Sequence, residues 1–290
     1  MVGYLKNLIS NSAFPSIDFK VNCFIVGAQK AGTSALFNYL LNHPEITGST
    51  TKEVKYFSSD KLYSKGEKWY RRQFRYNPLK NAPSIAVDAT PLYLYLPIVP
   101  ERIEDYNSEC KIIVMLRNPI DRAYSHWNMF RQFYSEKNAK NRPGILYANP
   151  NEKASISKLL SKSEFPSFRE AIKEELELIK GEVDGFEPSW IRRGLYYDQL
   201  IRFHEFFNKE HILILDYNKF KTNTRGVLES VSRFLDISEF DWSKIDLSPR
   251  HSRTYNEKIS IDDRLYLREF FHHPNEKLFN YLQEDYGWND

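Results

Sequence analysis

One stretch near the start of the chain has the composition of a phosphate-binding loop. Residues 24–36 are FIVGAQKAGTSAL, an apolar run followed by small residues, one lysine and a helical pattern. Glycine lets the backbone curl until several N–H groups face one point, and the following helix offers its positive N-terminal end. Lys30 adds a full positive charge to this arrangement. We therefore expect residues 27–34 to bind an anion such as a phosphate group.

The loop departs from the pattern of nucleoside triphosphatases, G-x-x-x-x-G-K-[ST]. Gly27 and Gly32 have the required spacing, but Thr33 follows where that pattern has lysine, and the lysine lies inside the loop as Lys30. The same residues are also compatible with an ordinary turn between a strand and a helix. Evidence from the rest of the chain must decide between a phosphate site and a simple turn.

A second candidate anion site follows another apolar run. Arg117 comes directly after residues 111–116, and the carboxyl end of a parallel strand is where open α/β sheets bind ligands. Ser125 lies about two helical turns further on, and Arg122 lies one turn before Ser125. A hydroxyl and a guanidinium at this spacing can converge with Arg117 on one phosphate. The alternative makes Arg122 a surface capping partner and Ser125 a filler of the helix.

Two anion sites at the ends of two strands suit a nucleotide that carries phosphate at both ends. At these motifs the chain resembles the sulfotransferases that use 3′-phosphoadenosine 5′-phosphosulfate (PAPS). The family's 5′-phosphosulfate loop looks like residues 29–34, and its 3′-phosphate motif, an arginine with a serine eight residues later, looks like Arg117 and Ser125. Further matching segments are residues 52–57, 87–93, 193–200 and the C-terminal tail near Trp288. The match is closer to the heparan-type and bacterial carbohydrate branch than to the small-phenol branch.

The resemblance implies roles for the residues of the first loop. Sulfuryl transfer passes through a loose transition state, so positioning and cationic stabilisation supply most of the catalysis. Lys30 would neutralise the oxygen that bridges sulfur to the leaving phosphate. Six residues of the loop and the helix start would contact the 5′-phosphate: Gln29, Lys30, Ala31, Gly32, Thr33 and Ser34. Residues 31–34 would donate their backbone N–H groups.

The acceptor side of the reaction also needs a base, and the resemblance points to Glu53. Lys52 and Lys55 would grip an anionic acceptor or the sulfonate. The chain departs from the heparan-type enzymes here, because these often carry His and Asp where it has Lys55 and Ser58. The alternative is that Glu53 is a surface acid paired with a lysine.

Four further residues are weaker candidates. Asp88, which follows the apolar residues 84–87, either orients the acceptor or a lysine, or caps the next turn. Tyr197 flanks the adenine or, like many aromatic residues before an amphipathic helix, packs in the core. Arg250 and Arg253 fall where the family has a basic, glycine-containing loop over the 3′-phosphate, but the glycine is missing here.

The elements that hold these residues are expected to be alternating strands and helices. Apolar runs predict strands at residues 22–26, 84–87, 111–116 and 211–215, and periodicity predicts helices at residues 33–43, 121–134, 167–180, 197–207, 225–235 and 262–285. This alternation predicts an α/β fold with a central parallel sheet flanked by helices, and the resemblance implies the P-loop-like sulfotransferase version of it. We expect one domain over residues 1–290, with residues 132–164 as a surface insertion or flap beside the site.

Composition excludes several other classes of protein. A net charge of +3 over 290 residues is too small for a protein whose main partner is nucleic acid. The first residues lack the apolar region of a signal peptide, and no apolar run approaches the ~18 residues of a membrane span, so we expect a soluble, cytoplasmic protein. Cys23 and Cys110 are expected to be buried thiols, with a disulfide between them left open. The seven histidines form no ligand motif, so no metal is expected.

The sequence therefore predicts a PAPS-dependent sulfotransferase that moves a sulfonate, by in-line transfer, to a hydroxyl or amine of a carbohydrate or of another glycosylated or small metabolite. A nucleotide kinase using residues 27–34 is the first alternative, although the G-K-[ST] order and a clear magnesium-binding acid are missing. A non-catalytic protein that binds a nucleotide or anion with the same fold is the second.

Overall fold

The computed structural model describes residues 14–78, 83–135, 158–159, 161–182, 189–248 and 257–289. The chain forms two compact units, the first from residues 1–116 and 202–252 and the second from residues 117–201 and 253–290. Most of the expected flap at residues 132–164 lies outside the described residues, as do Arg250 and Arg253. The flap, the roles of these two arginines and the single domain over residues 1–290 therefore stay predictions.

The first unit is built on a five-stranded sheet. Its strands are β1 (Cys23–Gly27), β2 (Ile46–Gly48), β3 (Ile85–Ala89), β4 (Lys111–Leu116) and β5 (Ile212–Asp216). They lie in the order β2-β3-β1-β4-β5, and every neighbouring pair is parallel. All residues of β1 are buried, as expected for a strand of a parallel sheet covered on both faces. The predicted α/β fold with a central parallel sheet is confirmed.

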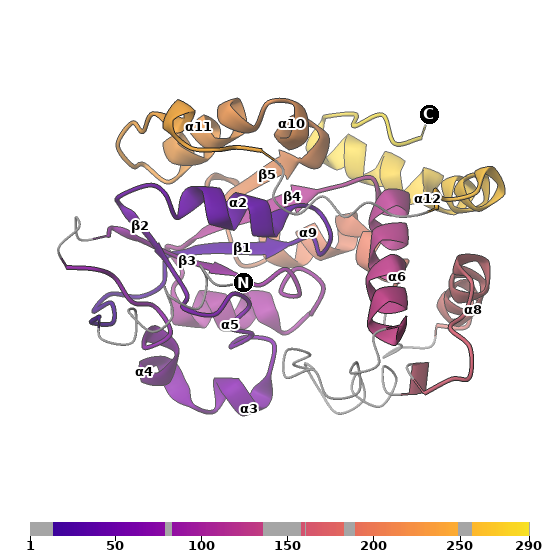
Figure 1. Ribbon diagram of the computed structural model, residues 1–290, viewed down its shortest axis with the longest axis horizontal. Coiled ribbons are helices and arrows are strands. Elements are labelled where there is room, and N and C mark those ends of the chain that lie inside the picture. The colour runs from indigo at the N-terminus through magenta and orange to yellow at the C-terminus, as the bar shows by residue number, and fades with distance from the viewer. Residues whose placement is uncertain are drawn as a thin grey trace. The chain divides into compact units, whose positions relative to one another are not determined.

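Helices cover both faces of this sheet (Figure 1). One face carries α2 (Thr33–Leu40), α10 (Tyr217–Thr222) and α11 (Thr224–Phe234), and the other carries α5 (Val99–Tyr106). Helix α2 contacts β1 and β3, and α11 contacts α2 and β5. Two short helices, α3 (Asp60–Tyr63) and α4 (Gly66–Arg71), follow the segment that contains Glu53.

The strand order places the first loop at a position that favours ligand binding. From β1 the chain builds β2 and β3 on one side, and it then builds β4 and β5 on the other side. In open α/β sheets the crevice for ligands lies at the carboxyl end of the strand where the order reverses. That strand is β1, so the fold brings the loop after Gly27 to this crevice.

The second unit is a helical body with its own apolar core. It contains α6 (Pro119–Ser135), α8 (Phe168–Lys180), the short turn η2 (Arg192–Gly194) and α12 (Ile261–Leu282). Buried residues from these elements, among them Trp127, Ile172, Trp190 and Phe271, form one cluster. Gly194 is required there, because a Cβ atom would lie 2.8 Å from the Cβ of Pro119. Residues 196–201 of helix α9 (Tyr196–His204) belong to this unit, and residues 202–204 belong to the first.

The predicted elements agree closely with the structure, and the differences have a common cause. Each predicted strand exists with bounds that differ by at most two residues, and each predicted helix with bounds that differ by at most three. Five short elements of three to eight residues were not predicted, because they carry too little periodicity: β2, α3, α4, α5 and α10. Asp88 lies inside β3 and not after it.

The state of the two cysteines and the apolar character of the helices were also predicted from the sequence. Both cysteines are free and buried, and burial is the main cause that raises the pKa of each thiol. Within the described ranges, no helix is both long and apolar enough to cross a membrane.

Candidate functional site

At the end of β1, where the first loop begins, the backbone of Gly27 lies close to the side chain of Leu94. The Ala28 N–H donates to the Met115 carbonyl at 2.8 Å, and the Leu94 N–H donates to the Val26 carbonyl at 2.8 Å. A Cβ atom on Gly27 would lie 2.6 Å from the Cβ of Leu94. Glycine is therefore needed at this position, because any side chain would push the turn around Leu94 away from β1.

The next residues form a concave backbone suited to an anion. Lys30 and Gly32 have positive φ angles of 72° and 86°. Alternation of left-handed and right-handed residues turns successive N–H groups toward one point. Gly32 is also the N-cap of α2, where no described side chain caps the helix and the first turn contains no acid. The N–H groups of Thr33 and Ser34 at this uncapped positive end suit a phosphate, and Lys30 adds charge.

The structure changes the expected role of Ala31. Its N–H donates to the Ala28 carbonyl at 3.1 Å, and the residue is fully buried. Ala31 therefore closes the loop and does not present its N–H group to a phosphate as we expected. Gln29, Lys30, Gly32 and Ser34 are half-buried, and Thr33 is buried with 4% exposure.

Tyr217, the first residue of α10, also lies at this loop and was not among the predicted site residues. A Cβ atom on Gly32 would lie 2.9 Å from the Tyr217 ring. The tyrosine follows β5 directly, and Asp216 caps α10 by accepting from the N–H groups of Asn218 and Lys219. The rule that selected Arg117, the residue directly after a predicted strand, pointed here to Asp216, because the predicted strand ended at residue 215 and β5 ends one residue later.

Residues 51–58, here called the base loop, contain the expected base. Glu53 and Lys55 both have positive φ angles, 62° and 57°. Such angles are strained for residues other than glycine and cluster at functional sites. The Glu53 carboxylate lies 3.1 Å from Lys52 Nζ, and the two side chains are 39% and 19% exposed. The structure thus contains the lysine pair of the alternative explanation, and the role of Glu53 as a base stays a prediction.

Asp88 does not have the position expected of an acceptor-binding residue. It is fully buried, and its carboxylate accepts hydrogen bonds from Tyr70 Oη at 2.7 Å, Thr90 Oγ1 at 2.7 Å and Tyr93 Oη at 3.1 Å. Burial raises the pKa of Asp88, although the three hydroxyl donors act in the opposite direction. Among the described residues these three hydroxyls and no backbone N–H group donate to the carboxylate, so the alternative of a cap for the next turn is wrong. The role of Asp88 in orienting the acceptor or a lysine stays a prediction.

In the second unit, Arg117 and Ser125 lie at the start of α6 as the spacing predicted. Asn118 caps this helix, since its Oδ1 accepts from the Ile120 N–H at 2.9 Å. The Tyr196 hydroxyl donates to the Arg117 carbonyl at 2.8 Å and so fixes the backbone of the arginine. Burial raises the pKa of Tyr196 to about 12. Arg117 is half-buried and Ser125 is 4% exposed, and their joint contact with a phosphate stays a prediction.

Two other candidates in this unit, Arg122 and Tyr197, contact other parts of the protein. Arg122 is fully buried and donates to the Trp190 carbonyl, so it does not join Arg117 at the surface. Burial, with Arg193 and Arg117 nearby, lowers the pKa of Arg122 to about 10. The Tyr197 ring packs on α12, with Lys277 Nζ 4.1 Å from the ring centre and Tyr281 in edge contact. This is the packing role of the alternative explanation and leaves adenine stacking by Tyr197 unsupported.

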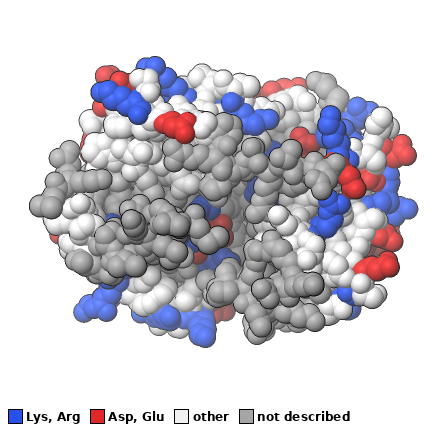
Figure 2. All heavy atoms as spheres, viewed as in Figure 1, with Lys and Arg blue, Asp and Glu red and all other residues white. Residues whose placement is uncertain are grey.

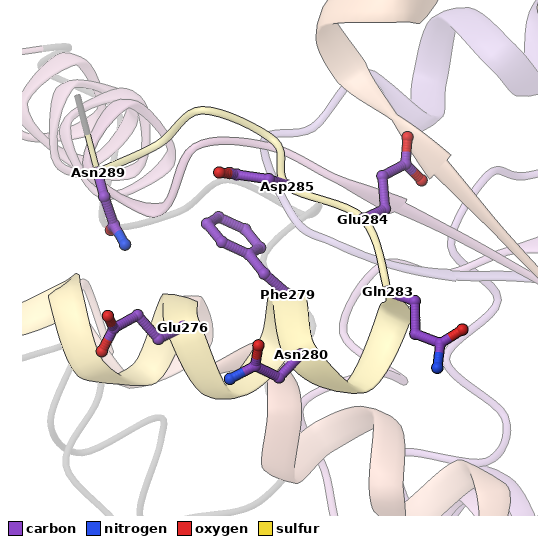
Figure 3. Close-up of a pocket in the computed structure, with 7 residues that line it drawn as sticks. All are labelled: Glu276, Phe279, Asn280, Gln283, Glu284, Asp285 and Asn289. Carbon is purple, nitrogen blue, oxygen red and sulfur yellow. The ribbon is translucent and has the colours of Figure 1, made fainter.

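A cavity of about 500 Å³ in the second unit is a poor candidate for the nucleotide. Phe279 points from α12 toward the C-terminal segment that carries Asp285 and Asn289 (Figure 3). The lining residues are Glu276, Phe279, Asn280, Gln283, Glu284, Asp285 and Asn289. Three carboxylates and no cation among them would repel a ligand that carries several phosphate charges.

Most of the chain is similar in sequence to known proteins. The family model described as "Sulfotransferase domain" matches residues 20–258. The membrane-associated sulfotransferase kil1 of Dictyostelium discoideum is 26% identical, over 93% of this chain and 66% of its own length. Heparan sulfate glucosamine 3-O-sulfotransferase 5 of Mus musculus is 25% identical, over 91% of this chain and 72% of its own. The human bifunctional heparan sulfate N-deacetylase/N-sulfotransferase 2 is 27% identical, but the chain covers only 29% of its length.

A solved structure supports the same fold. A sulfotransferase from Alicyclobacillus acidocaldarius superposes with a TM-score of 0.70 at 26% identity, covering 94% of this chain and all of the other.

Proposed function

The chain belongs to the sulfotransferase domain family, and we propose that it transfers a sulfonate group from PAPS to a hydroxyl or amine of a carbohydrate acceptor. The observation that carries this proposal is the first loop. Lys30 and Gly32, both with positive φ, precede an uncapped helix start at the carboxyl end of the central strand β1. This arrangement suits a 5′-phosphate whose leaving oxygen gains charge during transfer.

The residues of the first loop fit the phosphate end of the donor. PAPS, once bound, supplies a sulfonate on a phosphate leaving group. The N–H groups of Thr33 and Ser34 and their hydroxyls hold the 5′-phosphate, and Lys30 neutralises the charge that develops on the leaving oxygen. Arg117 and Ser125 hold the 3′-phosphate. Gln29 contributes to the same loop, and Arg250 and Arg253 are proposed to cover the 3′-phosphate.

The base loop serves the acceptor. Glu53 accepts the proton of the attacking hydroxyl or amine, and Lys52 and Lys55 hold anionic groups of the acceptor or the sulfonate. The strained φ angles of Glu53 and Lys55 support this role, because strain of this kind persists where the surrounding structure enforces it.

An acidic glycan that contains glucosamine is the acceptor class we propose. Two of the similar proteins are named for reactions on heparan sulfate. Four exposed basic residues lie on or beside α3 and α4, directly after the base loop: Lys61, Lys65, Lys68 and Arg72. Figure 2 shows Lys and Arg side chains along the lower edge of this face, where Figure 1 has these helices. Positive charge beside the base loop favours a carboxylated or sulfated chain.

Titration calorimetry with adenosine 3′,5′-bisphosphate and with ATP tests the donor site. We expect tight, magnesium-independent binding of the bisphosphate and no binding of ATP. Preference for ATP with magnesium would instead support the kinase alternative. Tight binding of the bisphosphate without turnover on any acceptor would support the non-catalytic alternative.

A second assay identifies the accepting atom. Radiolabelled PAPS is incubated with an N-acetylated glucuronic acid–glucosamine polymer, which offers hydroxyls, and with its N-deacetylated form, which adds amines. Label in both polymers indicates O-sulfation, and label in the deacetylated polymer alone indicates N-sulfation. Label in neither, with active transfer to small glycosides, would refute the polymeric acceptor.

The expected cytoplasmic location stays a prediction. One of the similar proteins is named a membrane-associated sulfotransferase, and the chain covers 66% of that protein's length. Fractionation of cells that express this chain would locate it.

A further inference from the structure

We propose that the turn formed by residues 90–94, anchored on the buried carboxylate of Asp88, is a positioning device that holds the base loop in register with the phosphate-binding loop. This inference rests on the proposed function, because it assumes that the two loops carry the base and the donor phosphate. It assigns no direct role in the reaction to Asp88, Tyr93 or Leu94. All of the residues involved belong to the first unit.

One end of the turn holds the base loop. The Tyr93 hydroxyl accepts a hydrogen bond from the Phe57 N–H at 3.3 Å, and the Phe57 carbonyl accepts one from Arg102 Nη1 at 3.0 Å. The Tyr93 and Phe57 rings also meet edge to face, with centres 5.7 Å apart. The backbone of the base loop is therefore tied on both sides of Phe57, four residues after Glu53.

The other end of the turn holds the phosphate-binding loop. The Leu94 N–H donates to the Val26 carbonyl at 2.8 Å. The Leu94 side chain fills the space beside Gly27, where a Cβ atom would lie 2.6 Å from it. Lys30 follows Gly27 by three residues. Neighbouring residues of one tight turn thus contact both loops.

Asp88 fixes the direction of the hydrogen bonds in this turn. When it is ionised, the Asp88 carboxylate only accepts, so Tyr70, Thr90 and Tyr93 then all donate to it. With its proton committed to Asp88, the Tyr93 oxygen has lone pairs left for the Phe57 N–H. The Tyr93 N–H in turn donates to the Thr90 carbonyl at 3.0 Å and closes the turn.

Accurate placement matters because in-line transfer needs the attacking atom and the leaving group in a narrow geometry. A mutation far from the reacting atoms that misplaces them by about 1 Å can slow a reaction by about 100-fold. The strained φ angles of Glu53 and Lys55 make the base loop dependent on such anchors.

The variant Tyr93→Phe tests this inference, since it removes one hydroxyl and keeps the ring. The matched control is Tyr106→Phe. Tyr106 is also buried, its hydroxyl accepts from the Val21 N–H at 2.8 Å, and its ring also contacts Phe57, with centres 5.5 Å apart. Among the bonds that the structure shows, Tyr106 has no hydrogen bond to Phe57 or Asp88. Tyr106→Phe therefore also removes one buried, hydrogen-bonded hydroxyl, but not one that holds the base loop.

We expect Tyr93→Phe to lower kcat by roughly 10- to 100-fold, with affinity for adenosine 3′,5′-bisphosphate unchanged, while Tyr106→Phe keeps kcat within about twofold. Amide hydrogen exchange should speed up in peptides covering residues 52–58 for Tyr93→Phe, and near residue 21 for Tyr106→Phe. Equal kcat in the two folded variants, or unchanged exchange at residues 52–58 in Tyr93→Phe, would overturn the inference. Absence of transfer by the unmodified protein would instead count against the proposed function, and the exchange measurement would still decide whether the turn holds the base loop.

Discussion

Replacing Gly32 with alanine separates the backbone strain of the first loop, residues 27–34, from its packing, because Gly66 offers a matched control. Both glycines have positive φ angles, 86° at Gly32 and 77° at Gly66. A Cβ atom at Gly66 would meet nothing within 4 Å, whereas one at Gly32 would lie 2.9 Å from the Tyr217 ring and 3.5 Å from the Met115 sulfur. Both substitutions thus carry the free-energy cost of a positive φ angle, and only Gly32→Ala adds the cost of a steric clash.

The expected magnitudes follow from these two terms. A left-handed conformation costs an L-residue about 1–2 kcal/mol, so Gly66→Ala should lower the free energy of unfolding by about that amount. Gly32→Ala adds overpacking against Tyr217, which typically costs about 1–3 kcal/mol. We therefore expect a total loss of about 2–5 kcal/mol for Gly32→Ala in urea unfolding. The difference between the two variants measures the packing of Tyr217 on the loop.

The same pair of variants tests the anion site by calorimetry. Because relief of the clash must move either Tyr217 or the Gly32 backbone, Gly32→Ala should weaken binding of adenosine 3′,5′-bisphosphate by at least tenfold, which is about 1.4 kcal/mol. Gly66→Ala should bind as the unmodified protein does. Equal losses of stability in the two variants, together with full affinity in Gly32→Ala, would refute this account of the loop.

Three further predictions concern single charged residues. Lys30→Ala should abolish sulfonate transfer while keeping part of the bisphosphate affinity, whereas Arg117→Ala should mainly weaken that affinity; transfer assays and calorimetry on both variants check this contrast. Glu53→Gln should lose turnover with little change in bisphosphate affinity, and near-normal turnover would remove Glu53 as the base. Burial raises the pKa of Asp88 in the folded state above its unfolded value of about 3.9. The protonated carboxyl therefore contributes its full stabilising free energy below the unfolded pKa, and this free energy is lost as the pH rises through the folded pKa. The stability of the unmodified protein relative to Asp88→Asn should therefore fall as the pH rises above about 4 in urea unfolding. A difference independent of pH would contradict the shift.

The sequence alone identified the features that depend on neighbouring residues. An apolar run followed by small residues and a lysine predicts β1, the loop and α2, because strand, turn and helix start are all encoded within residues 24–36. The position of Arg117 between β4 and α6 was predicted for the same reason. The α/β fold followed from the alternation of such local patterns along the chain.

Local patterns could not give the order of the strands or the partners of buried polar groups. That β1 is the strand where the order reverses depends on pairings between residues far apart in the chain, such as Cys23 with Val87 and with Lys111. The sequence allowed a surface position for Arg122 and a site role for Asp88, because both are charged and follow or lie near apolar runs. Only the tertiary structure surrounds them with Trp190 and with Tyr70 and Tyr93.

Tyr217 and the turn at residues 90–94 show the same division. The sequence encodes a tyrosine after one strand and a short turn after another, and neither is informative in isolation. Folding brings the tyrosine ring against Gly32 and the turn against both Val26 and Phe57. The residues proposed for anion binding were thus identified from the sequence, while long-range packing decided which groups contact the two loops.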